Sequence, residues 1–203
     1  MVERNTGRPD YRESSNPSQT VILVDQDGVL ADFDGEFLRR WQRMYPNLPY
    51  VQLEQRTGFF ISDDYPTELI EQVQTIYNSP GFIVNLPPIP GGLEALRAMR
   101  REGYIIKICT AQIPGNRDCL TEKQDWIVDY LGKEWVKDLI IANDKTMIYG
   151  QILIDDKPEI TGALTPSWEH VIFDAPYNKN VSGKRRLTSW DNWHGILVPS
   201  DDR

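Results

Sequence analysis

Two carboxylates stand directly after a short apolar run near the start of the chain. Asp25 and Asp27 follow residues 21–24, a continuous apolar and largely β-branched segment. In an extended backbone, side chains two residues apart point in the same direction. Unpaired, these carboxylates would repel each other, and a divalent cation or a shared proton would offset this cost. A solvated polar loop is the alternative for this pair alone. A calcium-binding EF-hand loop is excluded, because Leu30 occupies the position that requires glycine.

Further polar side chains follow three later apolar runs at the corresponding place. They supply a hydroxyl, an amine and a second pair of carboxylates. These groups are Thr110 after residues 104–109, Lys145 after residues 139–142, and Asp155 and Asp156 after residues 152–154. In an open parallel sheet the carboxyl ends of the strands share one edge, and ligands bind there. We therefore expect all of these groups to meet at one site.

This combination of groups is what magnesium-dependent phosphoryl transfer requires. Carboxylate oxygens are hard ligands that suit Mg²⁺. A hydroxyl and an ammonium group bind phosphoryl oxygens and neutralise their charge. One aspartate can attack phosphorus and form an aspartyl-phosphate. A second carboxyl group can protonate the leaving oxygen and then activate water.

Five short apolar runs are the candidate strands that would position these groups. Their β-branched, continuously apolar composition is typical of strands that are buried on both faces of a parallel sheet. The candidates are residues 21–24, 104–109, 139–142, 152–154 and 170–173. Helical patterns lie between several of them, and this alternation predicts an α/β fold with a mostly parallel sheet.

Two amphipathic helices are expected between the strands. Residues 93–101 carry their apolar side chains on one side and end before Gly103, a glycine C′ cap. Thr121 and Gln124 resemble a capping box, which predicts a second helix with Thr121 as N-cap. Lys123 would then lie in the first turn, where the helix dipole disfavours a cation. A nearby phosphate would reverse this preference, and a solvated surface lysine is the alternative.

The segment 34–87 breaks the alternation of strands and helices. Its two ends show helical spacing of apolar residues, and residues 56–61 between them are loop-like. We interpret the segment as a helical insertion after the first strand. The predicted organisation is a disordered tail at 1–19, an α/β core formed by 20–33 and 88–203, and the inserted helical segment.

Composition excludes several classes of protein. The 203 residues are 40% hydrophobic and 26% charged, as in an ordinary globular protein. The net charge of −8 disfavours polymeric nucleic acid as a partner. Two cysteines cannot build a disulfide framework, two histidines disfavour a zinc site, and a cytoplasmic location is expected. No apolar run approaches the ~18 residues of a membrane span, so no membrane partner is expected.

The polar motifs resemble the four motifs of the haloacid-dehalogenase-like (HAD) phosphohydrolases. Longer matches narrow the resemblance to the 5′(3′)-deoxyribonucleotidases and extend over residues 20–197. They are the segments 27–33, 108–110, 144–146, 153–158, 165–170 and 186–190. The resemblance implies a Rossmann-like HAD core and a small helical cap formed by residues 34–87. A cap of this kind closes over the site and excludes water.

The resemblance also implies roles for individual residues. Asp25 is expected to be the nucleophile and a Mg²⁺ ligand. Asp27 is expected to be the general acid and base, with its backbone carbonyl on the metal. Asp156, with Asp155 beside it, would complete the metal site. The phosphate-binding residues would be Thr110, Lys123 and Lys145, and the nucleobase-binding residues would be Phe33, Phe59, Phe60 and Ile61.

The function that follows is Mg²⁺-dependent hydrolysis of deoxyribonucleoside monophosphates such as dUMP or dTMP. The resemblance also implies a homodimer, although no exposed apolar stripe in the sequence marks its interface. Ala111, residues 112–115, Asn143 and Phe60 depart from the family pattern beside the substrate. These departures leave base and sugar preference open.

Two other functions remain to be separated from this one. The first is a HAD phosphatase for another small phosphomonoester or for a nucleic-acid 3′-phosphate. The second is a nucleotide-binding module without turnover, which is expected to have lost its nucleophile or lysine. Asp25 and Lys145 are both present.

Overall fold

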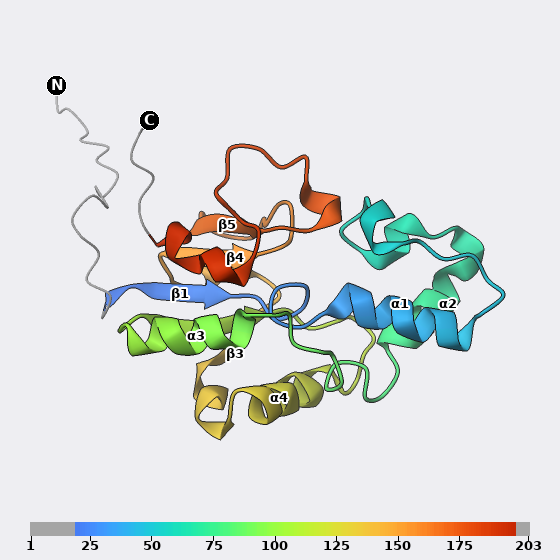
Figure 1. The fold of residues 1–203 in the computed structure, drawn as a ribbon, viewed down its shortest axis with the longest axis horizontal. Helices are drawn as coiled ribbons and strands as arrows, with labels where there is room; N and C mark the ends of the chain where they lie inside the picture. Colours follow the sequence, from blue (N-terminus) through green and yellow to red (C-terminus); the bar gives the residue numbers. More distant parts are fainter. Residues whose placement is uncertain (1–18, 198–203) are drawn as a thin grey trace.

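The computed structural model describes residues 19–197, so the predicted tail at 1–19 lies outside the described residues except for Gln19. Within this range the strands form one six-stranded sheet in the order β3-β2-β1-β4-β5-β6. Every pair of neighbouring strands is parallel, and β1 lies near the centre (Figure 1). The strands are β1 Val21–Val24, β2 Ile105–Thr110, β3 Leu139–Ile141, β4 Ile152–Asp155, β5 Glu169–Phe173 and β6 Arg186–Leu187.

The central strands are apolar throughout because both faces of the sheet are covered. Leu23 and Leu153 pack on one face in a small cluster with Trp168. Ile22 and Val24 point to the other face and join the main core. All four strand residues are 0% exposed. This two-sided burial explains why the strands appear in the sequence as continuous apolar runs rather than alternating ones.

The four helices of the described range lie where the sequence predicts helices, at the two ends of the inserted segment and between the strands. Figure 1 shows α1 and α2 side by side beyond the carboxyl end of β1. The helices are α1 Phe33–Met44, α2 Ile70–Tyr77, α3 Gly92–Arg101 and α4 Cys119–Tyr130. Short 3₁₀ turns lie at Leu53–Gln55, Ile61–Asp64, Thr67–Leu69, Lys133–Asp138, Lys145–Met147, Pro176–Asn178 and Trp190–Ile196. None of the helices within residues 19–197 has the length and apolar character needed to cross a bilayer.

The predicted start of α4 is wrong. The helix begins at Cys119 with Asp118 as N-cap, so Thr121 lies inside it and forms no capping box. The preceding loop fixes the earlier start, because Asn116 Oδ1 accepts a hydrogen bond from the Asp118 N–H at 3.0 Å. Lys123 is therefore the fifth helical residue rather than a residue of the first turn.

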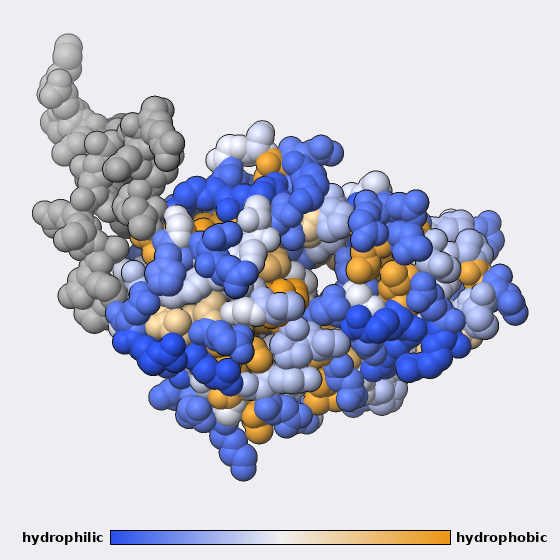
Figure 2. All heavy atoms as spheres, viewed as in Figure 1, coloured by the Kyte–Doolittle hydropathy of each residue, from blue (hydrophilic) through white to orange (hydrophobic). Residues whose placement is uncertain are grey.

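The inserted helices share the hydrophobic core of the sheet. Trp41 of α1 and Val73 and Ile76 of α2 are fully buried in the same cluster as Ile22 of β1. Asp32 caps α1, because its side chain accepts a hydrogen bond from the Gly35 N–H at 3.0 Å. The surface in the view of Figure 2 is largely hydrophilic, with hydrophobic residues in small scattered groups.

The C-terminal part of the described chain anchors the loop that follows β1. Neither β6 nor the 3₁₀ segment Trp190–Ile196 is predicted from the sequence. Trp190 is 1% exposed, and its indole N–H donates to the Val29 carbonyl at 2.9 Å. The indole nitrogen would also lie 3.0 Å from a Cβ at position 92, so Gly92 permits this close packing.

This anchor gives a test of stability. Trp190→Phe is expected to lower the free energy of unfolding by about 2 kcal/mol, because the buried Val29 carbonyl loses its partner. Urea unfolding followed by circular dichroism measures the change. Trp193→Phe, in the same segment and 5% exposed, is the matched control and should cost less. Equal losses in the two variants would show that the hydrogen bond is not the source of the stability.

Candidate active site

Three of the four carboxylates predicted for this site meet at the carboxyl edge of the sheet. Oxygen atoms of Asp25, Asp155 and Asp156 lie within 4.8 Å of one another. The three residues are 9%, 1% and 3% exposed, respectively. They converge because β1 and β4 are parallel neighbours, and the Asp25 N–H donates to the Ile154 carbonyl at 2.9 Å.

Lys145 lies among these carboxylates. Its Nζ is 2.9 Å from Asp25 Oδ1 and 2.6 Å from Asp155 Oδ2. Burial favours the neutral amine, but Asp25 and Asp155 hold the pKa of Lys145 above its ordinary value. Burial raises the pKa of Asp155 to about 6, opposed by Lys145 and reinforced by Asp25. One ammonium group for three carboxylates leaves an excess of negative charge.

The residues of this cluster fit a divalent cation. Burial, together with the charges of Asp155 and Asp25, raises the pKa of Asp156 well above its ordinary value. A cation would remove that penalty, and all the available donors are the hard oxygens that Mg²⁺ prefers. Gly28 adopts a positive φ of 74°, and a Cβ there would lie 2.2 Å from Asp156 Oδ2. Only glycine therefore lets the turn after β1 approach the cluster so closely.

The hydrogen bonds distinguish the three carboxylates. Asp155 is engaged at both oxygens, by Lys145 Nζ and by the Lys157 N–H at 2.9 Å. Among the bonds of the described residues, none engages Asp25 Oδ2 or Asp156 Oδ1. Asp25 and Asp156 are thus the residues best able to hold a cation, whereas Asp155 orients Lys145.

A second buried lysine lies beneath Asp27. Lys123 is 0% exposed, and its Nζ lies 2.6 Å from Asp27 Oδ2 and 2.7 Å from Thr110 Oγ1. Burial raises the pKa of Asp27, Lys123 opposes this effect, and Asp25 adds to it. A carboxyl group with a raised pKa is suited to donating and accepting a proton near neutral pH. The Asp27 carboxylate is not part of the three-carboxylate cluster, so only its backbone carbonyl remains as its predicted metal contact.

A cavity of about 370 Å³ joins the polar groups to an aromatic wall. This volume lies in the range of small-molecule sites. Asp25, Asp27, Thr110 and Asp156 line it, and so do the four residues predicted to bind the base, namely Phe33, Phe59, Phe60 and Ile61. Lys123 and Lys145 are not in the wall, and each lies behind a lining residue to which it is bonded.

The family model for "5′ nucleotidase, deoxy (Pyrimidine), cytosolic type C protein" matches residues 19–200. This chain belongs to the 5′(3′)-deoxyribonucleotidase family. It is 42% identical over 185 residues to the human cytosolic-type 5′(3′)-deoxyribonucleotidase. This alignment covers 87% of this chain and 92% of the human protein. It is 41% identical over 185 residues to the human mitochondrial enzyme, covering 87% of this chain and 81% of the relative. As a member of this family, the protein is a phosphoric monoester hydrolase.

Solved structures confirm the predicted HAD core of this deoxyribonucleotidase family member. A haloacid dehalogenase-like hydrolase from Streptococcus pneumoniae aligns with a TM-score of 0.57 at 12% identity, covering 89% of this chain and 99% of that protein. A HAD family hydrolase from Deinococcus radiodurans, solved with bound phosphate and sodium, aligns with a TM-score of 0.54 at 17% identity. This alignment covers 90% of this chain and 96% of that protein.

Two residues of this deoxyribonucleotidase site are missed by the sequence analysis. The Tyr177 hydroxyl donates a short hydrogen bond to Asp156 Oδ2, and Asn178 Nδ2 donates to the Asp156 carbonyl at 2.7 Å. Both residues follow β5. Ligands bind at the carboxyl ends of parallel strands, so the end of the fifth candidate strand, residues 170–173, is the signal that could have placed Tyr177 and Asn178 at the site.

His170 of β5 supports the cluster from behind. Lys184 Nζ can only donate, so it donates to His170 Nδ1 at 2.9 Å, and the ring proton lies on Nε2, 3.4 Å from the Asp155 carbonyl. Burial, with the nearby Lys184 charge, lowers the pKa of His170 to about 4. The ring is therefore neutral in the folded protein at neutral pH.

The His170 environment predicts a loss of stability in acid. The unfolded-state pKa is about 6.5, so the stabilisation is present above that pH and is lost as the pH falls towards 4. The wild type is expected to lose about 2 kcal/mol relative to His170→Gln between pH 7 and pH 5. Urea unfolding at both pH values measures the difference. His194→Gln is the control, because the His194 side chain is 65% exposed. An equal change of stability with pH in the His170→Gln and His194→Gln comparisons would contradict the role given to His170.

Proposed function

We propose that this protein hydrolyses deoxyribonucleoside monophosphates, such as dUMP or dTMP, to nucleoside and phosphate in a Mg²⁺-dependent reaction. The observation that supports this function is the single cavity that connects the carboxylates to Phe33, Phe59, Phe60 and Ile61. Its polar end suits a phosphoryl group, and its aromatic wall suits a nucleobase, since base–aromatic stacking contributes about 1–3 kcal/mol per base.

The metal would be held by Asp25 and Asp156, with the backbone carbonyl of Asp27 as a further ligand. When bound, Mg²⁺ neutralises charge on the phosphoryl oxygens. Asp155 keeps Lys145 beside Asp25 through the 2.6 Å contact. Lys145, Lys123 and Thr110 would receive the remaining phosphoryl oxygens, because Thr110 provides a hydroxyl in the cavity wall and the two lysines provide ammonium groups directly behind it.

The reaction would proceed in two displacements at phosphorus. A carboxylate oxygen of Asp25 attacks phosphorus as the ester P–O bond breaks, and Asp27 donates its proton to the departing nucleoside oxygen. Water then attacks the phosphorus of the aspartyl-phosphate while Asp27 accepts a proton from it. The bond between phosphorus and Asp25 breaks, which releases phosphate and restores the carboxylate. The raised pKa of Asp27 suits both proton transfers.

The inserted segment 34–87 would act as a cap over this reaction. It supplies Phe59, Phe60 and Ile61 to the cavity, whereas the catalytic carboxylates Asp25 and Asp27 come from the loop that follows β1. Closure of the cap would exclude water from the site during the first displacement.

The nucleophile is tested by Asp25→Asn. We expect phosphate release from dUMP to fall at least about a thousandfold, because the amide cannot form the covalent intermediate. Removal of Mg²⁺ with EDTA should abolish release by the wild type, and added Mg²⁺ should restore it. Asp125→Asn, an exposed carboxylate of α4, is the control and should keep wild-type activity. Intact turnover in Asp25→Asn would rule out this mechanism.

The substrate class is tested with Phe60→Ala. Phe60 is 59% exposed, so its loss should not disturb folding. The KM for dUMP is expected to rise about tenfold, as stacking with the base is lost, whereas the KM for glycerol 2-phosphate, which has no aromatic ring, should stay the same. Tyr50→Ala, which removes an exposed aromatic outside the cavity wall, is the control.

A panel of phosphomonoesters separates the alternative substrates. The wild type is compared on dUMP, its 3′-phosphate isomer, UMP and a 3′-phosphorylated oligonucleotide. The proposed function requires the highest kcat/KM on a deoxyribonucleoside monophosphate. Preference for the oligonucleotide would identify a nucleic-acid 3′-phosphatase instead.

A further inference from the structure

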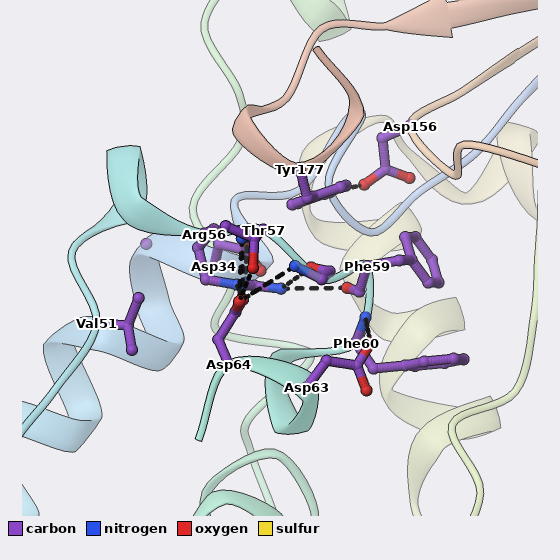
Figure 3. A network of polar contacts seen from close by, with 12 residues as sticks. Asp34, Val51, Arg56, Thr57, Phe59, Phe60, Asp63, Asp64, Asp156 and Tyr177 are labelled. Carbon is purple, nitrogen blue, oxygen red and sulfur yellow. Dashed lines mark hydrogen bonds and ion pairs between the residues drawn. The ribbon is translucent and has the colours of Figure 1, made fainter. Parts of the chain in front are cut away.

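Arg56 is a buried cation in the irregular part of the inserted segment. Its side chain is 4% exposed. Arg56 Nη1 lies 2.6 Å from Asp34 Oδ2, and Nε lies 2.6 Å from Asp64 Oδ2. Nη2 donates to the carbonyls of Gly58 and Phe59 at 2.9 and 3.1 Å. One guanidinium thus ties α1, the turn at Ile61–Asp64 and the segment between them together (Figure 3).

Two carboxylates hold the same segment through its N–H groups. Asp64 Oδ1 accepts from the N–H groups of Thr57 and Gly58 at 3.0 and 3.1 Å. Asp63 Oδ2 accepts from the Phe60 N–H at 3.2 Å. Arg56 binds carbonyl groups of the same stretch, so both the N–H groups and the carbonyl groups of this backbone are held by side chains. The stretch carries Phe59 and Phe60 of the cavity wall.

Tyr177 connects this network to the acidic cluster. The Arg56 guanidinium carbon lies 5.2 Å from the centre of the Tyr177 ring, within the range of a cation–π contact. The Phe59 ring meets the Tyr177 ring edge-on at 5.8 Å. The Tyr177 hydroxyl donates to Asp156 Oδ2, as Figure 3 shows. A continuous series of contacts therefore leads from the aromatic wall to a carboxylate of the proposed metal site.

We propose that Arg56 is a positioning residue that fixes the 57–61 segment on the core, and that Tyr177 links this segment to Asp156. This inference rests on the proposed function, in which the segment contacts the base and Asp156 holds the metal. Arg56 contacts neither the base nor the metal in this scheme, so its effect on turnover is indirect. The geometry requires arginine, because lysine has three donors on one nitrogen and cannot bind four acceptors in a plane.

The first test replaces Arg56 with lysine. In the protein without metal or substrate, Arg56→Lys is expected to speed amide hydrogen exchange in residues 57–63 about tenfold, because charged hydrogen bonds to the segment are lost. The KM for dUMP should rise about tenfold, with little change for glycerol 2-phosphate, which has neither a base nor any other aromatic ring. Arg43→Lys, at an exposed arginine in the last turn of α1, is the matched control and should match the wild type.

The second test separates the ring of Tyr177 from its hydroxyl. Tyr177→Phe keeps the ring under Arg56, so exchange in residues 57–63 should match the wild type. Its Mg²⁺ affinity, measured by calorimetry, should fall about tenfold, because Asp156 loses an orienting hydrogen bond. Tyr177→Leu should show the same loss of affinity and also exchange about threefold faster in residues 57–63.

The exchange and calorimetry outcomes test the positioning role even if the proposed function is wrong. Unchanged exchange in Arg56→Lys, or an equal rise of KM for both esters, would overturn the positioning role. If Arg56→Lys does not fold, the tyrosine pair still decides, because the Leu and Phe variants must differ in exchange at 57–63. A wild type that does not hydrolyse dUMP would refute the proposed function, whereas the exchange and calorimetry results would still test the contacts.

Discussion

The arrangement of the site depends on carboxylates that are buried close together at the ends of two parallel strands. Asp25, Asp155 and Asp156 lie within 4.8 Å of one another, and burial raises the pKa of both Asp155 and Asp156. Lys145 offsets part of this cost, and Lys123 does the same for Asp27. The surrounding residues support this arrangement: the strand edge places the acids, Gly28 leaves room for Asp156, Tyr177 donates to the Asp156 carboxylate, and His170 contacts the backbone carbonyl of Asp155. Such a cluster costs stability in the absence of a cation, and binding of the proposed Mg²⁺ would relieve this cost.

The core of the site could be predicted from the sequence because it follows from one topological rule. Asp25, Thr110, Lys145 and Asp156 each follow an apolar run, and parallel strands bring such positions to one edge. The parts that were missed depend on contacts that no local pattern records. Strand β6 has two residues, too few to show a pattern. The start of α4 moved because Asn116 bonds to Asp118, a contact specific to that loop.

The aromatic wall and the acidic cluster come from different parts of the chain, yet they are joined through side chains rather than through regular secondary structure. Arg56 is the clearest example of what the sequence could not show. In the printed sequence it is one arginine in a polar loop, and its role appears only when Asp34, Asp64 and Tyr177 surround it. Irregular segments of this kind carry specificity, because a rigid scaffold can hold them in one conformation by hydrogen bonds to their backbone.

The order of strands in the sheet has a consequence for synthesis of the chain. Val21 at the start of β1 is bonded to Gln151, 130 residues later, and the loop after β1 is bonded to Trp190, 161 residues later. While the ribosome is still making the second half, β1 has an open hydrogen-bonding edge and an apolar face with nothing to cover it. Closing such distant contacts is slow. The nascent polypeptide therefore passes through a long, aggregation-prone interval in which a chaperone has the most to protect.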